Sequence, residues 1–252
     1  GYGKMGGKEL GYASDLDLVY LFDDDAMDAE ENYTRLGQRL NSWLSNQTPA
    51  GILFETDLRL RPNGDSGLLA VPVEAFRDYQ LKNAWTWEHQ ALTRARFCAG
   101  DPAVGQRFEA IRTEILRLPR DLAKLKEDVV AMRQKMYAAH ALNSETGFAL
   151  KHDPGGIIDV EFIVQYLILG HAHQHAELTG NLGNIALLRI AGELGLIDPA
   201  QARAVGNAYR EYRRLQHARR LSAMPKAPIP REEVEAHIAA VSALWQAVFG
   251  SD

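Results

Sequence analysis

The spacing of apolar residues changes near residue 74, and this change constrains the fold more than any other feature of the sequence. Before it, three segments have the composition and alternation of β-strands, namely residues 16–22, 52–61 and 68–73. After it, apolar residues recur three and four positions apart, as on one face of a helix. The sequence therefore predicts an α+β protein, with a small mixed sheet and helices over residues 1–100 and an all-α helical bundle over residues 101–252.

The helices of this prediction follow from the same spacing. They are expected over residues 28–45, 74–81, 85–99, 102–117, 120–142, 157–174, 181–195, 199–222 and 231–249. Residues 1–12 contain five glycines and predict a loop with at most one short helix.

Charge and composition exclude several classes of protein. The formal net charge of -5 and a pI near 5.9 argue against wholesale binding of nucleic acid. Cys98 is the only cysteine, so no intrachain disulfide can form, which fits a reducing cytoplasm. No apolar run reaches the length of a membrane span. We expect a cytoplasmic protein without a nucleic-acid or membrane partner, and a first residue other than Met suggests a fragment of a longer chain.

Three aspartates stand on the first two predicted strands. Asp15 and Asp17 are two positions apart, so a strand places both side chains on one face, and Asp57 lies on the next strand. Carboxylates that share a face repel one another, and apolar neighbours disfavour their charge. A divalent cation removes both penalties. The three acids therefore predict a catalytic site suited to Mg²⁺, with one or two metal ions.

A glycine-rich turn precedes these acids. Gly6 and Gly7 permit backbone N–H groups to approach an anion closely, while Lys4 adds positive charge. Ser14 offers a hydroxyl donor to a phosphate. Alone, a D-x-D pair is commonly a surface or capping feature, and a glycine pair is commonly a tight turn. In this order they predict an ATP phosphate site beside metal-binding carboxylates, as nucleotidyl transfer requires.

Arg59 and Arg61 lie on the same predicted strand face as Asp57. Two interpretations stay open at this point. In a functional role the guanidinium groups would meet the triphosphate or hold the carboxylates; in a structural role they would form ion pairs with Glu55 or another nearby acid.

Other polar groups support structural interpretations better than functional ones. Lys82–Arg96 is dense in Trp, His and Arg, and its aromatic residues either stack on a base or join the two domains; the second is favoured. A solvated turn is expected for Asp23-Asp24-Asp25, and a solvated helix end is preferred to a metal site for His171, His173 and His175.

A second glycine pair, Gly155-Gly156, precedes a predicted helix that carries Asp159 and Glu161 in its first turns. Acids at this end stabilise a helix through its dipole, which is a sufficient structural reason for both. The two side chains are about 200° apart around a helix. One of them is therefore expected to point into a polar cleft, and a role near the metal site stays open as an alternative.

Four blocks of the sequence together resemble the bifunctional glutamine synthetase adenylyltransferase family. They are GYGKMGGKELGYASDLDLVYLF, TDLRLRPNGDSGLL, AWTWEHQALTRAR and GGIIDVEFIVQYL. This family belongs to the polymerase β-like nucleotidyltransferase superfamily, so the resemblance implies that fold for residues 1–100. By residue match, Asp15 and Asp17 correspond to the metal dyad of the family, and Gly6-Gly7 to its glycine pair.

Members of this family carry two such domains, one that attaches AMP to glutamine synthetase and one that removes it by phosphorolysis. Tyr2, Gly11-Tyr12 and Leu16 resemble the attaching copy, and the chain ends soon after the predicted bundle, as the C-terminal copy does. The resemblance implies Mg²⁺ and ATP as cofactors, glutamine synthetase as protein substrate, the PII signalling protein as regulator, and an N-terminal adenylyl-removing half. AMP removal, or a silent domain that binds nucleotide or PII, are the alternatives.

Overall fold

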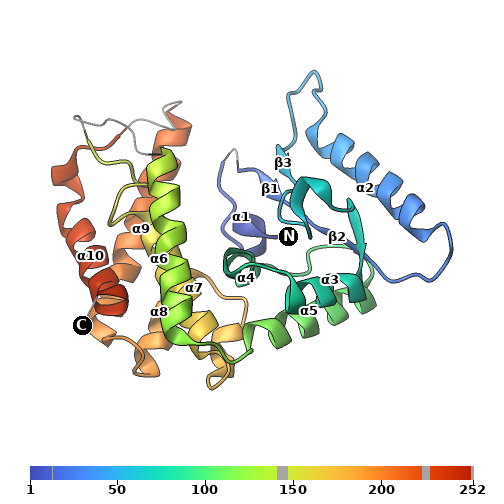
Figure 1. Cartoon of the computed structure of the whole chain (residues 1–252). Helices are drawn as coiled ribbons and strands as arrows, with labels where there is room; N and C mark the ends of the chain where they lie inside the picture. Colours follow the sequence, from blue (N-terminus) through green and yellow to red (C-terminus); the bar gives the residue numbers. More distant parts are fainter. Residues whose placement is uncertain (13, 141–146, 223–227, 251–252) are drawn as a thin grey trace. The chain divides into compact units, whose positions relative to one another are not determined.

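The computed structural model describes residues 1–12, 14–140, 147–222 and 228–250. The chain divides into two compact units, Gly1–Leu116 and Arg117–Asp252, which are described separately. Most of the described residues are helical, and the strands are short and confined to the first unit (Figure 1). The prediction of an α+β protein is confirmed at this level.

The first unit contains four short strands and five α-helices among its described residues. In chain order these are α1 (Gly3–Gly6), β1 (Leu16–Asp17), β2 (Tyr20–Phe22), α2 (Ala29–Ser45), β3 (Thr56–Asp57), the 3-10 turn η1 (Gly64–Ser66), β4 (Ala70–Pro72), α3 (Val73–Lys82), α4 (Thr86–Leu92) and α5 (Pro102–Leu116). The strands form two parallel pairs, β1 with β3 and β2 with β4. The strand predicted over residues 16–22 is thus divided between two pairs.

The strand predicted over residues 52–61 pairs only at Thr56 and Asp57, and the reason is local. The Asp57 carboxylate accepts a hydrogen bond of 2.9 Å from the backbone N–H of Arg59. This side-chain bond makes an Asx turn, which competes with the ladder and ends the strand.

A small apolar cluster holds the β2–β4 pair against the start of α2. Phe22, Ala29 and Ala70 are buried together, and Tyr20 and Tyr33 pack on them. The rings of Phe22 and Tyr33 stack with centroids 4.7 Å apart. This cluster fixes the β2–β4 pair, which follows β1 closely in the chain.

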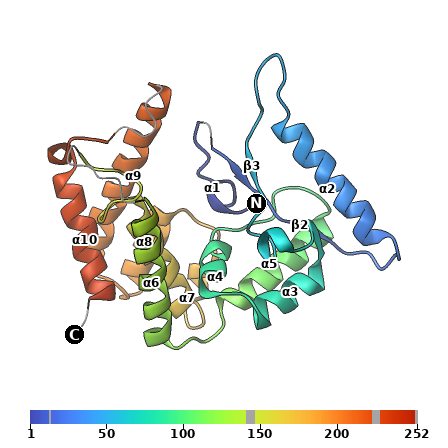
Figure 2. The same ribbon diagram turned by 45° about the horizontal axis from the view of Figure 1, so that its top comes forward.

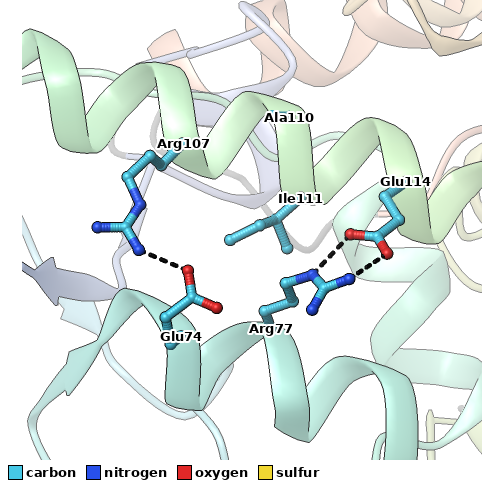
Figure 3. A pocket seen from close by; sticks show the side chains of 6 residues that line it. All are labelled: Glu74, Arg77, Arg107, Ala110, Ile111 and Glu114. Atoms are coloured by element: carbon cyan, nitrogen blue, oxygen red, sulfur yellow. Dashed lines mark hydrogen bonds and ion pairs between the residues drawn. The ribbon is translucent and has the colours of Figure 1, made fainter.

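The helix α5 belongs to the first compact unit, although the sequence places it in the second domain, after residue 100. Its packing against α3 explains the difference. The rings of Phe76 and Phe108 lie 5.9 Å apart, and Arg77 donates two hydrogen bonds to Glu114, of 2.8 and 2.6 Å. Figure 3 shows this pair and the Arg107–Glu74 pair on either side of a cavity of about 330 Å³.

The second unit consists of helices among its described residues. They are α6 (Leu122–His140), α7 (Ile157–His171), η2 (Ala176–Thr179), α8 (Asn184–Glu193), α9 (Pro199–Leu221), η3 (Arg231–Glu233) and α10 (Glu235–Phe249). The helix α7 is apolar on almost every face and is buried by α6, α8, α9 and α10 (Figure 2). Across the described residues, no helix is both long enough and apolar enough to cross a membrane.

Candidate functional site

The pairing of β1 with β3 brings Asp17 and Asp57 side by side. The two residues are register partners in the parallel ladder, which is closed by the Leu16 N–H to the Glu55 carbonyl and by the Leu18 N–H to the Asp57 carbonyl, both at 2.9 Å. Partners in a parallel ladder present their side chains on the same face. The sequence could name these acids, but only the register makes them neighbours.

Electrostatics shows that Asp15 belongs to the same group. The pKa of Asp17 is raised to about 6, first by burial of its carboxyl group and then by the negative charges of Asp15 and Asp57. Lys4 and Arg94 act in the opposite direction and lower this pKa. The structure therefore places three acids close enough to repel one another, with two cationic side chains beside them.

Asp57 is engaged by an arginine two residues along the chain. The Arg59 Nε donates to both carboxylate oxygens at 3.0 Å, and its Nη2 donates to Oδ2 at 2.5 Å. These bonds lower the pKa of Asp57. Arg59 therefore holds one of the three predicted carboxylates, which belongs to the functional interpretation, while its contact with a triphosphate stays a prediction.

Arg61 has a different surrounding from Arg59, although both were predicted on one strand face. Its Nη1 donates to the carbonyl of Leu58 at 2.8 Å and approaches Asp65 at 3.4 Å, and its Nε lies 3.4 Å from the Gly67 carbonyl. The guanidinium therefore closes the turn that follows β3. Contact of Arg61 with a triphosphate stays a prediction.

The glycine pair serves close packing in this structure. The Gly6 N–H donates to Tyr2 at 2.8 Å and the Gly7 N–H to Gly3 at 3.0 Å, so both donors are engaged within α1. A Cβ at Gly6 would stand 2.1 Å from the carbonyl oxygen of Arg94. The expectation that these two N–H groups face an anion does not match the observed hydrogen bonds, because they close the turn instead.

Ser14 and Lys4 complete the residues predicted around the phosphate. Ser14 is buried, and its hydroxyl oxygen accepts a hydrogen bond of 3.0 Å from the Gly11 N–H, which orders the turn before β1. Lys4 lies in α1, close enough to Asp17 to lower its pKa. Lys4 is thus placed beside the carboxylates, and Ser14 has a role in the backbone turn.

Two arginines after α4 attach the glycine turn to the rest of the unit. Arg96 donates to the carbonyls of Gly6 and Met5 at 3.1 and 3.2 Å. Arg94 pairs with Glu9 at 3.0 Å. These contacts hold the turn against the segment that follows α4.

Glu88 is a further residue that the sequence analysis missed. It is buried, accepts a hydrogen bond from the backbone N–H of Trp85 at 2.8 Å, and accepts another from the Tyr79 hydroxyl at 2.9 Å. A Glu three residues after a helix-capping position is the signal that identifies such a capping box. Trp85 and Trp87 are exposed, and their expected role in joining the two domains stays a prediction.

The chemistry of the carboxylates fits a hard divalent cation, since all three predicted ligands are oxygen donors. Asp17 is crowded by two like charges, which a cation would neutralise. In the conformation of the described residues, no group of three or more His, Cys, Asp or Glu side chains is arranged to hold a metal ion. The donors are therefore near one another without converging, and the Arg59 fork on Asp57 is one visible reason.

The other acidic and histidine groups lie in different surroundings. Asp159 is buried, pairs with Arg133 and accepts a 2.6 Å bond from the Gly155 N–H. Burial raises the pKa of Asp159, and these two partners act against that rise. Asp23 pairs with Arg107, which gives the predicted solvated turn a structural contact. Among the described histidines, no metal-binding group is found at His171 or its neighbours.

The comparisons with known proteins agree with the resemblance found in the sequence. Residues 1–111 match the family model of glutamate-ammonia ligase adenylyltransferase, and residues 123–227 match that of GlnD PII-uridylyltransferase. The chain belongs to the glutamate-ammonia ligase adenylyltransferase family.

Its relatives carry a single name, bifunctional glutamine synthetase adenylyltransferase/adenylyl-removing enzyme. The proteins of Aromatoleum aromaticum, Bordetella bronchiseptica and Nitrosomonas europaea are 66%, 59% and 55% identical to it, over 99%, 98% and 100% of this chain. The same alignments cover 26%, 26% and 28% of those proteins. The chain therefore spans about a quarter of the length of the curated relatives it matches.

Proposed function

We propose that this chain transfers AMP from ATP to a tyrosine hydroxyl of glutamine synthetase, releases pyrophosphate, and depends on Mg²⁺. The observation that carries the proposal is the pairing of Asp17 with Asp57 in the β1–β3 ladder, where the negative charges of Asp15 and Asp57 both act on Asp17. The substrate in this proposal is taken from the names of the relatives, which include glutamine synthetase. Such an activity belongs to the regulation of nitrogen assimilation in the cytoplasm.

In this proposal the three aspartates hold the metal ions and the glycine turn positions the triphosphate. When bound, the ions would polarise the α-phosphate and neutralise the developing charge on pyrophosphate. Lys4 and Arg94 lie beside Asp17, where they would balance the charge of the nucleotide. The N–H groups of Gly6 and Gly7 donate to carbonyl groups within the α1 turn. Their contribution would therefore be the close packing of this turn beside the aspartates.

The fold and domain assignments extend the same proposal. Residues 1–100 would be the polymerase β-like catalytic domain, with α5 packed on it, and residues 101–252 would supply the helical domain. The match of residues 123–227 to a PII-uridylyltransferase family supports a nucleotidyltransferase setting for the second unit. The PII protein as regulator and an N-terminal adenylyl-removing half are further parts of the proposal.

The relatives are bifunctional by name, so the direction of the reaction needs its own test. The chain should be given α-labelled ATP, Mg²⁺ and unmodified glutamine synthetase, and in parallel phosphate and adenylylated glutamine synthetase. Label on tyrosine in the first reaction is expected. Turnover in the second reaction alone would assign AMP removal instead.

A silent domain that binds nucleotide or PII is the remaining alternative. Calorimetry with ATP and Mg²⁺ addresses it, because three clustered acids predict ATP binding that requires the metal. Binding that persists unchanged in chelator would favour the silent domain.

A further inference from the structure

Arg59 occupies the carboxylate that the proposed metal site needs. Three donors of this one residue reach Asp57, namely Nε, Nη2 and the backbone N–H. Both carboxylate oxygens accept from the guanidinium. A divalent cation at Asp57 would have to share these oxygens with a fixed positive charge, so the ion and the guanidinium compete.

The ion pair is placed where it can open. The Arg59 side chain is 72% exposed, although that of Asp57 is only 20% exposed. Exposed ion pairs stabilise a protein only weakly, because water replaces the contact at little cost. The Arg133–Asp159 pair, whose side chains are 6% and 7% exposed, has no such freedom.

The displaced guanidinium would have a phosphate-binding shape. A planar fork of N–H donors matches phosphate oxygens as well as it matches a carboxylate. Arg61 is less suited to the same change, because its side chain is only 11% exposed and its guanidinium donates a hydrogen bond to the carbonyl of Leu58.

We infer that Arg59 is a built-in counter-ion for Asp57, which divalent cation and nucleotide displace together, and that the freed guanidinium then binds the nucleotide phosphates. The inference rests on the proposed function and adds a positioning role to it: Arg59 holds the Asp57 carboxylate in place until the site binds its ligands. Asp57 joins the metal site only after this exchange.

The test measures Mn²⁺ binding to the whole chain without nucleotide, from the electron paramagnetic resonance signal of the free ion. Arg59→Ala should bind Mn²⁺ about threefold to tenfold more tightly than the parent, since the competing ion pair is gone. Arg59→Lys, which keeps the charge but lacks the fork, should fall between them. Arg35→Ala is the matched control, because Arg35 is 66% exposed and pairs with Glu31 on α2; its Mn²⁺ affinity should equal that of the parent.

A second measurement distinguishes an Arg59 that moves from Asp57 to the nucleotide from an Arg59 that only stabilises the fold through its ion pair. At saturating Mg²⁺, calorimetry should show ATP binding to Arg59→Ala weakened about fivefold or more, because a charge-assisted phosphate contact is lost. The two affinities thus change in opposite directions. Unchanged or weaker Mn²⁺ binding by Arg59→Ala would overturn the inference.

Asp17→Asn distinguishes this failure from failure of the proposed function. If it binds Mn²⁺ as the parent does, the carboxylate metal site itself is refuted, and the role of Arg59 with it. If Asp17→Asn loses Mn²⁺ while Arg59→Ala matches the parent, the proposed function survives and only the counter-ion role is refuted.

Discussion

The two compact units carry similar short sequences, a glycine pair followed by two acids, but the acids have different neighbours in the two units. The first has Gly6-Gly7 ahead of Asp15-x-Asp17, and the second has Gly155-Gly156 ahead of Asp159-x-Glu161. In the second unit the buried acid is balanced by Arg133 and by the Gly155 N–H. In the first unit Asp17 has two acids as neighbours, which together with burial raise its pKa to about 6.

This difference separates a structural acid from a candidate functional one. A buried carboxylate with a cation and a hydrogen-bond donor stabilises the fold that surrounds it, whereas removal of one partner leaves a costly charge. A carboxylate crowded by others destabilises the fold until a ligand neutralises it. The glycine pairs do not distinguish the two cases, because Gly6 and Gly156 both allow close backbone packing.

The largest effect is expected for Asp17, the crowded acid of the first unit. Asp17→Asn should lower the rate of AMP transfer about 1,000-fold or more, because it removes a metal ligand. Its thermal unfolding temperature in chelator should equal or exceed that of the parent, since a repulsive charge is gone. The assay is labelled ATP with glutamine synthetase, beside thermal denaturation; a variant that keeps its rate would refute the assignment.

Asp159→Ala should show the reverse pattern. It leaves the Arg133 guanidinium buried without its acid, which costs about 3 kcal/mol in the free energy of unfolding. Urea denaturation measures this loss. Glu161→Ala is the control, because Glu161 stands two residues away on α7 and is less buried. Equal losses in both variants would mean that the comparison between the two acids is wrong.

Gly6→Ala tests the role of the glycine pair in packing. The new methyl group would stand 2.1 Å from the Arg94 carbonyl, so α1 must move, and we expect a loss of about 2 kcal/mol in unfolding free energy. Gly7→Ala, where the nearest atom is the flexible Arg94 side chain at 2.9 Å, should lose less. If calorimetric melts rank the two variants the other way, the close packing assigned to Gly6 is incorrect.

The smallest effect is a dependence of stability on pH. The pKa of Asp17 is raised to about 6 in the folded protein and is near 4 in the unfolded chain. Between these two pH values Asp17 is therefore mostly protonated in the folded protein and mostly ionised in the unfolded chain. Asp17 therefore destabilises the metal-free protein above pH 6, and this penalty disappears as the pH falls.

The measurement compares parent and Asp17→Asn by urea denaturation in chelator at pH 7.5 and pH 4.5. The variant should gain about 1 kcal/mol over the parent at pH 7.5 relative to pH 4.5, after discount for solvent screening. Added Mg²⁺ should remove this gain at pH 7.5. A stability difference that is the same at both pH values would show that Asp17 is not electrostatically strained.

Local pattern was sufficient for most of the helices, although the helix predicted over residues 85–99 ends at Leu92. Apolar spacing predicted α2, α9 and α10 close to their observed bounds, because a helix is specified by contacts three and four residues apart. The D-x-D spacing predicted that Asp15 and Asp17 share one strand face; β1 contains Asp17 but not Asp15, so the shared face stays a prediction. The four family blocks in the sequence were confirmed by the comparisons.

Tertiary structure decided which charges meet. The register of β1 on β3 puts Asp17 beside Asp57. In the second unit, Arg133 and Asp159 form a buried ion pair. Tertiary structure also placed α5 in the first unit, through its packing against α3. These outcomes depend on partners distant in sequence and on the cost of removing charge from water, which no local pattern of residues records.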